Sequence, residues 1–465
     1  MKNKNAKQKK TGTVSRRDFL KQSSLAVVPL VMGSTLFSRA LYAETIEKPH
    51  TLVFVFLRGG ADALSILAPR KPLDRITYEK SRPNIKIPVD NLLPLTTGPS
   101  IKSPLGLNDA ASSLLPLYQN SELAFFMNVG CLNPTTSHFN QQDNIEDGFG
   151  ATRDGSISGG FLNRALSGIP IEERSKSLPA VSIDKSLARS LQGREPAVAF
   201  DNLETQVSSQ AEKDLSGGLK LSERLSAMFM LSEANVQNVD KILRGIGHRA
   251  DKAAKTMDEA RKQGKPDPDG TVPHPIDISP PEDYSGSEGK AFGNAVRLMN
   301  QDPGLRFLTI TVGGWDDHSN IGSSKDGAFA QRLKKFSDNL ATFVKDLKSN
   351  DLFDKTTIVV MSEFGRRIGE NSSKGCDHGR GGFAMVIGAG IEQQVTAPDF
   401  NLENKEGDGN LPVSIDYREI FTEILEKKMK LTNVRRSPIN TNVPLVFPDL
   451  SELKSKIKLF KVEKI

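Results

Sequence analysis

The sequence is poor in cysteine, in tryptophan and in long apolar runs. Two cysteines, Cys131 and Cys376, in 465 residues exclude a disulfide-stabilised scaffold. No segment reaches the about 20 consecutive apolar residues that a membrane-spanning helix needs, so we expect no membrane span in the mature chain. At 37% hydrophobic and 25% charged residues, the composition is that of an ordinary globular protein and not of a disordered or fibrous one.

Several motifs that carry common chemistries are also missing. The chain has no G-x-S-x-G, no P-loop, no H-E-x-x-H and no C-x-x-C, and no G-x-G-x-x-G follows its first strand. These absences argue against an α/β-hydrolase serine site, a P-loop nucleotidase, a zincin protease, a dithiol redox site and a dinucleotide-binding domain.

Positive charge is concentrated at the amino terminus. Residues 1–43 carry nine basic side chains and one acid, whereas the other 422 residues carry 53 basic and 55 acidic groups, a net charge of −2. A balance of this kind excludes the broad basic field that nucleic-acid binding uses, so no nucleic-acid partner is expected.

The amino terminus has the order of an export signal. Ser15–Lys21 (SRRDFLK) matches the twin-arginine signal, a modest apolar stretch follows from Leu25 to Phe37, and small residues offer cleavage after Ala43 or Ala40. We interpret residues 1–43 as a twin-arginine signal peptide. The expected partner is the twin-arginine export machinery, and the expected location is the periplasm or the exterior. Because this route carries folded proteins, it favours a cofactor or metal that is loaded before export.

The rest of the chain alternates apolar strands with amphipathic helices. This order predicts an α/β domain over 44–465, with a mostly parallel central sheet flanked by helices on both faces. The expected strands are Thr51–Leu57, Leu123–Val129, Arg306–Val312, Thr356–Met361 and Phe383–Ile387, and the clearest helices are Asn108–Tyr118, Phe329–Leu347 and Tyr417–Met429. The polar, proline-rich character of residues 150–290 predicts an inserted helical and loop-rich region there.

Polar residues follow four of these strands and precede the fifth. In open α/β sheets, ligands bind outside the carboxyl ends of the strands. The candidates are Arg58 and Asp62 after the first strand, Thr136, Ser137 and His138 after the second, Asp316 and His318 after the third, Glu363 and Arg366 after the fourth, and Asp377 and His378 before the last.

Each candidate also has a purely structural interpretation. The structural interpretation of Asp62 is a cap on the following helix, because aspartate is a favoured N-cap. The structural interpretation of Glu363 is a carboxylate neutralised by Arg366 or Arg367. The structural interpretation of the Asp316–His318 triplet is a solvated turn, whereas the glycine pair before it and the adjacent Trp315 favour a binding pocket. We retain both interpretations for each residue.

The hydroxyl-rich segment before His138 is the candidate nucleophile site. At a helix N-terminus, Ser137 would face backbone N–H groups that can stabilise an alkoxide and an attached anion. Thr136 is the close alternative, because a one-residue error in the helix start would exchange the two roles. The other interpretation of the segment is a simple helix cap.

Taken together, these motifs resemble the bacterial exported family catalogued as domain of unknown function 1501. The segments that carry the resemblance are Leu57–Asp62, Ser137–Phe139, Gly313–His318, Ser362–Arg366 and Asp377–Gly379, behind a twin-arginine signal. That family is placed with the alkaline phosphatase and sulfatase-like superfamily, whose members hold one or two metal ions at the carboxyl edge of the sheet. In that superfamily a Ser, Thr or formylglycine nucleophile opens a phosphate or sulfate ester.

The resemblance implies a role for each matching residue. By position, Asp62 is the metal ligand of the first strand and Ser137 or Thr136 is the nucleophile, beside His138. The metal ligands implied further along the chain are Asp316, His318, Glu363, Asp377 and His378. The D-x-x-x-H spacing of the superfamily is absent, and so is the sulfatase signature C-x-P-S-R, so no formylglycine is expected.

These observations predict a metal-dependent hydrolase of phosphate or sulfate esters that acts on a small anionic ester. The ligand set allows Mn, Mg or Ca, and its histidines keep Zn possible. Arg58 and Arg366 are the candidate clamps for the anion. The alternative is a non-catalytic secreted binding or assembly protein that retains the fold. Clustering of the candidate ligands would favour the hydrolase, and their dispersal the alternative.

Overall fold

The computed structural model describes most of the chain beyond the expected signal peptide. Residues 1–43 lie outside its described part, and every described helix and strand belongs to the unit Pro49–Ile465. The described residues are 48–97, 101–150, 159–174, 178–200, 284–301, 304–322, 327–392, 395–398, 400–435, 443–450 and 457–460.

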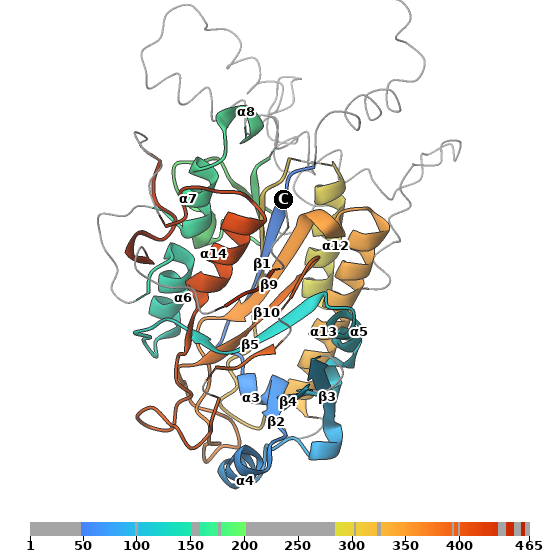
Figure 1. Ribbon diagram of the computed structural model, residues 1–465, viewed down its shortest axis with the longest axis vertical. Helices are drawn as coiled ribbons and strands as arrows, with labels where there is room; N and C mark the ends of the chain where they lie inside the picture. Colours follow the sequence, from blue (N-terminus) through green and yellow to red (C-terminus); the bar gives the residue numbers. More distant parts are fainter. Residues whose placement is uncertain are drawn as a thin grey trace, which may run out of the picture. The chain divides into compact units, whose positions relative to one another are not determined.

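A mixed, mostly parallel sheet forms the centre of this unit (Figure 1). Strand β1 lies between β9 and β8 and is parallel to both, and each of its seven residues is buried. The order is β11 (Val395–Thr396), β5 (Leu123–Gly130), β10 (Gly382–Gly388), β9 (Thr356–Ser362), β1 (Thr51–Leu57), β8 (Phe307–Val312), β6 (Ala180–Ile183) and β7 (Val198–Phe200), with β12 (Ile415–Asp416) paired to β5. The predicted fold class is confirmed.

One strand runs against the others. β10 is antiparallel to both β9 and β5, so the expectation that Phe383–Ile387 is a parallel strand is wrong. The apolar run reads the same in either direction, and the direction is set by the connection. Residues 363–381 contain no helix that could return the chain to the opposite edge, as a parallel crossover requires. The start of β10 therefore lies at the same edge as the carboxyl ends of β1, β5, β8 and β9.

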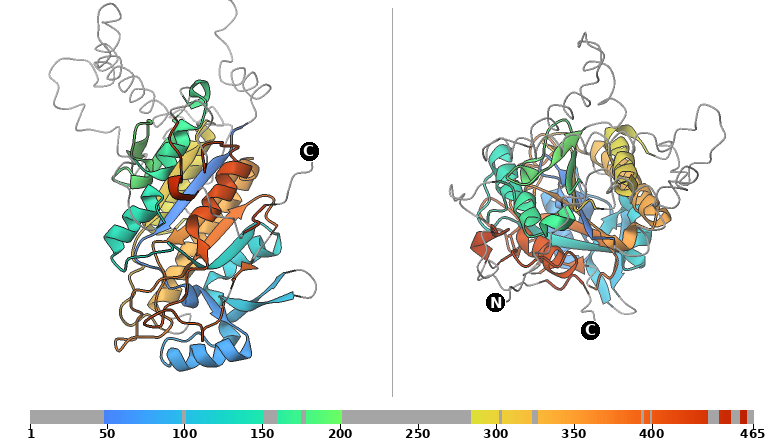
Figure 2. Two further views of the ribbon diagram at one scale, coloured as in Figure 1. Left: turned by 60° about the vertical axis from the view of Figure 1, so that its left-hand side comes forward. Right: turned by 90° about the horizontal axis from the view of Figure 1, so that it is seen from above.

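Both faces of the sheet are covered by helices, as predicted. Val53, Val55 and Leu57 of β1 belong to one apolar core, which also contains residues of α12 (Gly286–Gln301) and α13 (Ala328–Ser349). The alternate residues, such as Phe54, join a second core with α7 (Phe161–Ser167) and α14 (Tyr417–Lys427). Seen from above, α12 and α13 lie on the other side of β1 from α7 (Figure 2).

Two of the three predicted helices are confirmed as single elements. α13 extends the expected Phe329–Leu347 by a residue or two at each end, and α14 begins at Tyr417 behind a capping box made by Asp416 and Glu419. The segment Asn108–Tyr118 instead forms a 3-10 helix, η2 (Asp109–Leu114), followed by α5 (Leu115–Gln119). Pro116 in the first turn of α5 has no N–H to continue a longer helix through that point.

Part of the region expected to be an insertion belongs to the central sheet. β6 pairs in parallel with β8, and β7 pairs in parallel with β6. Strands of four and three residues are too short to give a clear periodic signal in the sequence. α7 and α8 (Ile171–Arg174) precede β6, and η3 (Arg189–Leu191) lies between β6 and β7. Residues 151–158, 175–177 and 201–283 lie outside the described part.

A small second sheet follows β1 along the chain. It has the order β2 (Leu67–Pro69), β4 (Ile101–Asn108), β3 (Leu92–Thr97), and is antiparallel throughout. The short helices near it along the chain are α3 (Ala63–Ile66), α4 (Pro72–Ser81) and η1 (Val89–Asn91). Two 3-10 turns lie elsewhere in the chain, η5 (Phe353–Lys355) and η6 (Pro448–Leu450). Among the described residues, no helix is both long and apolar enough to cross a bilayer.

Backbone segments approach closely where β1 ends. Gly59 has φ +121°, and a Cβ atom there would lie 2.4 Å from the Asp316 backbone nitrogen. We predict that Gly59→Ala lowers the free energy of unfolding by about 1–3 kcal/mol, because it combines backbone strain with a clash that only a loop shift can relieve. Gly313→Ala is the matched control, since nothing lies within 4 Å of its added methyl group. Equal urea-denaturation midpoints for the two variants would contradict the prediction.

Candidate metal centre

Two loops and one helix start meet at the carboxyl edge of the sheet. His138 is the first residue of α6 (His138–Asp147), Asp316 and His318 follow β8, and His378 precedes β10. One ligand atom from each of these four side chains lies within 4.8 Å of those of the others. The antiparallel direction of β10 brings His378 to this edge.

The distances within this group match those expected around one ion. Asp316 Oδ1 lies 2.9 Å from His318 Nε2, 3.2 Å from His138 Nε2 and 3.6 Å from His378 Nε2. The Nε2 atoms of His318 and His378 are 2.8 Å apart. Ligands about 2.0–2.1 Å from a tetrahedral zinc ion are roughly 3.3–3.4 Å from one another, so the four atoms need only small adjustments to bind one cation.

The hydrogen bonds of two histidines direct their Nε2 atoms into the group. His378 Nδ1 lies 2.7 Å from the Thr136 carbonyl oxygen, which can only accept, so Nδ1 carries the proton and Nε2 has the lone pair in a neutral ring. Burial lowers the pKa of His378, and the nearby charges of Arg366, His138 and His318 lower it further, against the hydrogen bond to Thr136. The neutral ring is the form that binds a metal.

His138 gives the clearest sign that the group fits a cation. Its Nε2 is buried and has no hydrogen-bond partner, although it faces Asp316 Oδ1. A buried polar nitrogen without a partner costs about 1–3 kcal/mol. A cation bound by the four side chains would satisfy this atom.

Arg366 is fully buried beneath the group and holds its loops together. Its guanidinium donates to the carbonyl oxygens of Gly59, Gly60 (2.6 Å) and Cys376 (2.8 Å) and to Asp316 Oδ1 (2.6 Å). Burial tends to raise the pKa of Asp316, but the hydrogen bond and charge of Arg366, with His138 and His318, lower it overall. Arg366 therefore holds the loops and Asp316 in place. Most of its N–H groups are bonded to the chain itself and are not directed toward a bound anion.

Asp62 is not part of the group. Its carboxylate is buried and forms a two-point ion pair with Arg82, at 2.5 and 3.0 Å, and it accepts from Ser65 Oγ at 2.5 Å. It also caps α3 through the Leu64 amide. Burial tends to raise the pKa of Asp62, but Arg82 and Ser65 lower it overall. Where the resemblance implies a metal ligand, the structure shows the N-cap and a buried counter-ion for Arg82.

Glu363 and Asp377 lie one layer outside the group, each beside a histidine. Glu363 is fully buried, with Oε1 2.7 Å from His138 Nδ1. Asp377 Oδ1 lies 3.8 Å from His318 Nδ1 and accepts from Asn371 Nδ2 at 3.0 Å. Both were candidate ligands, and neither contributes one of the four converging atoms.

The candidate nucleophiles Thr136 and Ser137 directly precede His138, and the Thr136 carbonyl contacts His378. Ser137 is the N-cap of α6, as predicted, and its side chain makes no capping hydrogen bond. Thr136, whose carbonyl binds His378, is exposed. Arg58 donates to Gln142 Oε1 at 2.7 Å and to Glu146 Oε2 at 2.8 Å, so its guanidinium is tied to α6.

From the sequence, His138 is predicted to act in catalysis and not as a metal ligand, and neither Gln142 nor Arg82 is predicted at the site. A pattern in the sequence does mark His138 and Gln142. His138, Gln142 and Glu146 recur at four-residue spacing, which places them on one face of a helix. No comparable signal marks Arg82, which meets Asp62 only through the fold.

The two cysteines form no disulfide and both are buried. Burial raises the pKa of the Cys376 thiol to about 12, so it stays protonated at neutral pH, and a redox role for the pair has no support in this arrangement.

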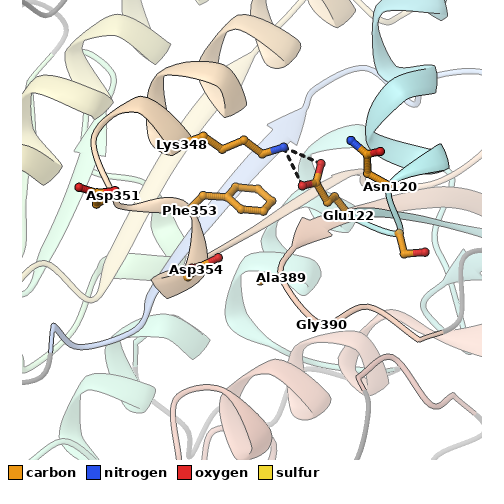
Figure 3. A pocket seen from close by; sticks show the side chains of 9 residues that line it. Asn120, Glu122, Lys348, Asp351, Phe353, Asp354, Ala389 and Gly390 are labelled. Carbon is orange, nitrogen blue, oxygen red and sulfur yellow. Dashed lines mark hydrogen bonds and ion pairs between the residues drawn. The ribbon is translucent and has the colours of Figure 1, made fainter.

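A separate pocket lies at the amino edge of the sheet, before β5 and β9 and after β10 (Figure 3). Lys348 Nζ bridges both carboxylate oxygens of Glu122 at 2.6 and 2.7 Å and lies 4.9 Å from the Phe353 ring centre. None of the candidate site residues lines this pocket.

The fold and the four converging side chains define an α/β protein with a candidate metal centre at the carboxyl edge of its sheet. The family model described as "Protein of unknown function (DUF1501)" matches residues 133–441. The chain belongs to this family, as the resemblance of its motifs predicts.

No curated protein matches the chain. Among solved structures, it is similar to the lipoteichoic acid synthase LtaP from Listeria monocytogenes (10% identity over 75% of this chain and 69% of that one, TM-score 0.30). It is also similar to a protein in the alkaline phosphatase superfamily from Vibrio parahaemolyticus (12% identity over 76% of this chain and 63% of that one, TM-score 0.29). A third similar structure is the periplasmic domain of EcEptC from Escherichia coli, solved in complex with Zn (10% identity over 74% of this chain and 75% of that one, TM-score 0.29). These likenesses are weak, and the function proposed below depends on the geometry of the site instead.

Asp62 and His318 should respond differently to substitution. We predict that Asp62→Asn lowers the free energy of unfolding by about 3–5 kcal/mol, because Arg82 would remain buried without its counter-ion, while bound metal per folded chain stays at the wild-type level. His318→Ala should lower bound metal and leave the metal-free protein about as stable as wild type. Elemental analysis and urea unfolding of both variants measure this, and metal loss in folded Asp62→Asn would contradict it.

The ion pair of Asp62 with Arg82 predicts that the stability of the fold depends on pH. Because the folded pKa of Asp62 lies below its ordinary value of 3.8, the stabilisation it gives is fully present above that value and is lost as the pH falls below it. Asp62→Asn should therefore remove part of the acid sensitivity of the wild type.

Proposed function

We propose that this chain is a metal-dependent hydrolase of phosphate or sulfate esters that is exported by the twin-arginine route. The observation that supports it is the convergence of His138, Asp316, His318 and His378 within 4.8 Å at the carboxyl edge of the sheet. A protein that retained the fold but bound no metal would have no reason to keep three histidines and a carboxylate directed at one point.

The donor set favours zinc over the other ions that the sequence allows. Three imidazole nitrogens and one carboxylate oxygen suit zinc, whereas manganese, magnesium and calcium prefer sites made mostly of oxygen. The acidic residues that would have favoured calcium or magnesium, Asp62, Glu363 and Asp377, lie outside the group of four. When bound, the ion would act as a Lewis acid that polarises the ester and lowers the pKa of a coordinated hydroxyl or water.

Ser137 is the proposed nucleophile. The residue before it holds His378 through its carbonyl, and the residue after it is His138, so the backbone of Ser137 is fixed on both sides to the group. The first N–H groups of the ten-residue helix α6 lack intrahelical acceptors and attract negative charge, which would stabilise an attached anion. Thr136 remains the alternative, and a metal-activated water is the third possibility.

The arginines have a smaller role in this proposal than the sequence suggests. Arg366 supports the loops, and Arg58 is engaged by Gln142 and Glu146 with its side chain 28% exposed. The N-terminus of α6 and the metal ion would therefore neutralise most of the charge of the bound anion.

A binding or assembly protein is the second candidate. The observation that favours it is the diversion of Asp62 to Arg82, which removes a ligand that the resemblance implies at the first strand. Such a protein would bind metal without turnover.

Metal analysis followed by an ester panel distinguishes the two candidates. The wild type, loaded separately with Zn and Mn, is assayed against aryl phosphate monoesters, phosphate diesters and sulfate esters. We expect turnover that a chelator abolishes, and Ser137→Ala should lower kcat by several orders of magnitude while metal content changes little. Activity of Ser137→Ala within a few-fold of wild type would transfer the role to Thr136 or to water. Metal binding without turnover of any ester would support the second candidate.

The export route has its own test. We predict that replacing Arg16 and Arg17 with lysine leaves the precursor in the cytoplasm, because the receptor of this route recognises the arginine pair. Cell fractionation and blotting measure the mature form. Normal amounts of mature periplasmic protein from the double variant would show that residues 1–43 act differently.

A further inference from the structure

A chain of polar contacts leads from the end of β1 to His138. Arg58 Nη1 donates to Gln142 Oε1 at 2.7 Å, and Gln142 Nε2 donates to Glu363 Oε1 at 2.8 Å. The same carboxylate oxygen lies 2.7 Å from His138 Nδ1. Because His138 and Gln142 are four residues apart on α6, both side chains reach Glu363 from one helix face.

The acceptor positions of Glu363 are taken by groups of the chain itself. The Gly59 amide donates to both carboxylate oxygens, at 2.9 and 3.2 Å, in addition to the contacts with Gln142 and His138. The Ser362 hydroxyl lies 2.8 Å from Oε2. A fully buried carboxylate with this many donors is satisfied without an ion of its own, so it is a partner of His138 and not a ligand.

The contact with Glu363 also determines which nitrogen of His138 carries the proton. An ionised carboxylate can only accept, so the proton lies on Nδ1 and the lone pair lies on Nε2. That lone pair is directed at the group, where Nε2 is buried, has no hydrogen-bond partner and lies 3.2 Å from Asp316 Oδ1. A neutral side chain in place of Glu363 would leave the ring able to adopt the other tautomer or to rotate.

We propose that Glu363 is a positioning residue that holds His138 in the Nε2-ligating form, and that Gln142 fixes Glu363 in turn. This inference rests on the metal centre of the proposed function. Partners of this kind typically change metal affinity 10–100-fold when they are removed. The spacing His-x-x-x-Gln places two of these residues on one helix: the ligand His138, and Gln142, which holds Glu363 in place.

Two measurements on Glu363→Gln test the proposal. Nitrogen-15 spectra of the histidine side chains of the metal-free protein report the tautomer of each ring, and the His138 signal is the one that His138→Ala lacks. Competition with a chromogenic chelator gives the dissociation constant for zinc alone. We expect the Nδ1–H form of His138 in wild type, a loss of that form in Glu363→Gln, and zinc binding weakened 10–100-fold.

Glu406→Gln is the matched control, because it makes the same chemical change at a carboxylate 3.3 Å from Arg380 and outside the site. It should keep wild-type zinc affinity. If Glu363→Gln does not fold, Gln142→Leu removes one donor to Glu363 and should weaken zinc binding several-fold.

The outcomes separate this inference from the proposed function. Wild-type zinc affinity with an unchanged His138 tautomer in folded Glu363→Gln would overturn the positioning role alone. Zinc binding and the tautomer change without any ester turnover would overturn the hydrolase alone. A wild-type chain that binds no zinc overturns both.

Discussion

The buried guanidinium of Arg366 is the contact on which the candidate site depends. It donates to the carbonyl oxygens of Gly59, Gly60 and Cys376 as well as to Asp316 Oδ1. The loops after β1 and β8 and the segment before β10 are therefore joined through one planar, permanently charged group. A lysine, with a single ammonium, could not make these contacts at once. The charge of Arg366 also reduces the repulsion that Asp316 and the nearby acidic side chains would otherwise impose on one another.

The arrangement of the three histidines shows a common construction. Each ring has a contact on its Nδ1 side that lies outside the converging group: Glu363 for His138, the Thr136 carbonyl for His378 and, at a longer 3.8 Å, Asp377 for His318. Metal-binding histidines are usually oriented by such partners. Of the acidic side chains beside the histidines, Asp316 alone contributes an oxygen to the converging group. Glu363 and Asp377 instead contact the histidine rings from outside it.

The sequence was sufficient to predict the sheet, its helices and the edge at which the polar residues gather, because buried strands and amphipathic helices have distinct periods. It was not sufficient to assign individual roles. Asp62 follows a buried strand, as a ligand would, and only the fold brings Arg82 to it. The direction of β10 was also hidden, since an apolar run has no polarity, yet this direction is what places His378 beside His318. Short strands such as β6 carried too few residues to be recognised.

The pairing of β1 has a consequence for how the protein is made. Its neighbours come from residues 307–312 and 356–362, so its two hydrogen-bonded edges remain open until more than 250 further residues have been synthesised. Contacts between such distant segments form slowly, and an apolar strand with open edges is prone to aggregate meanwhile. A transport route that threads unfolded chains would deliver β1 across the membrane well before either neighbour. The proposed twin-arginine route accepts the finished fold, so that this most apolar part of the chain would be paired before it leaves the compartment in which it is made.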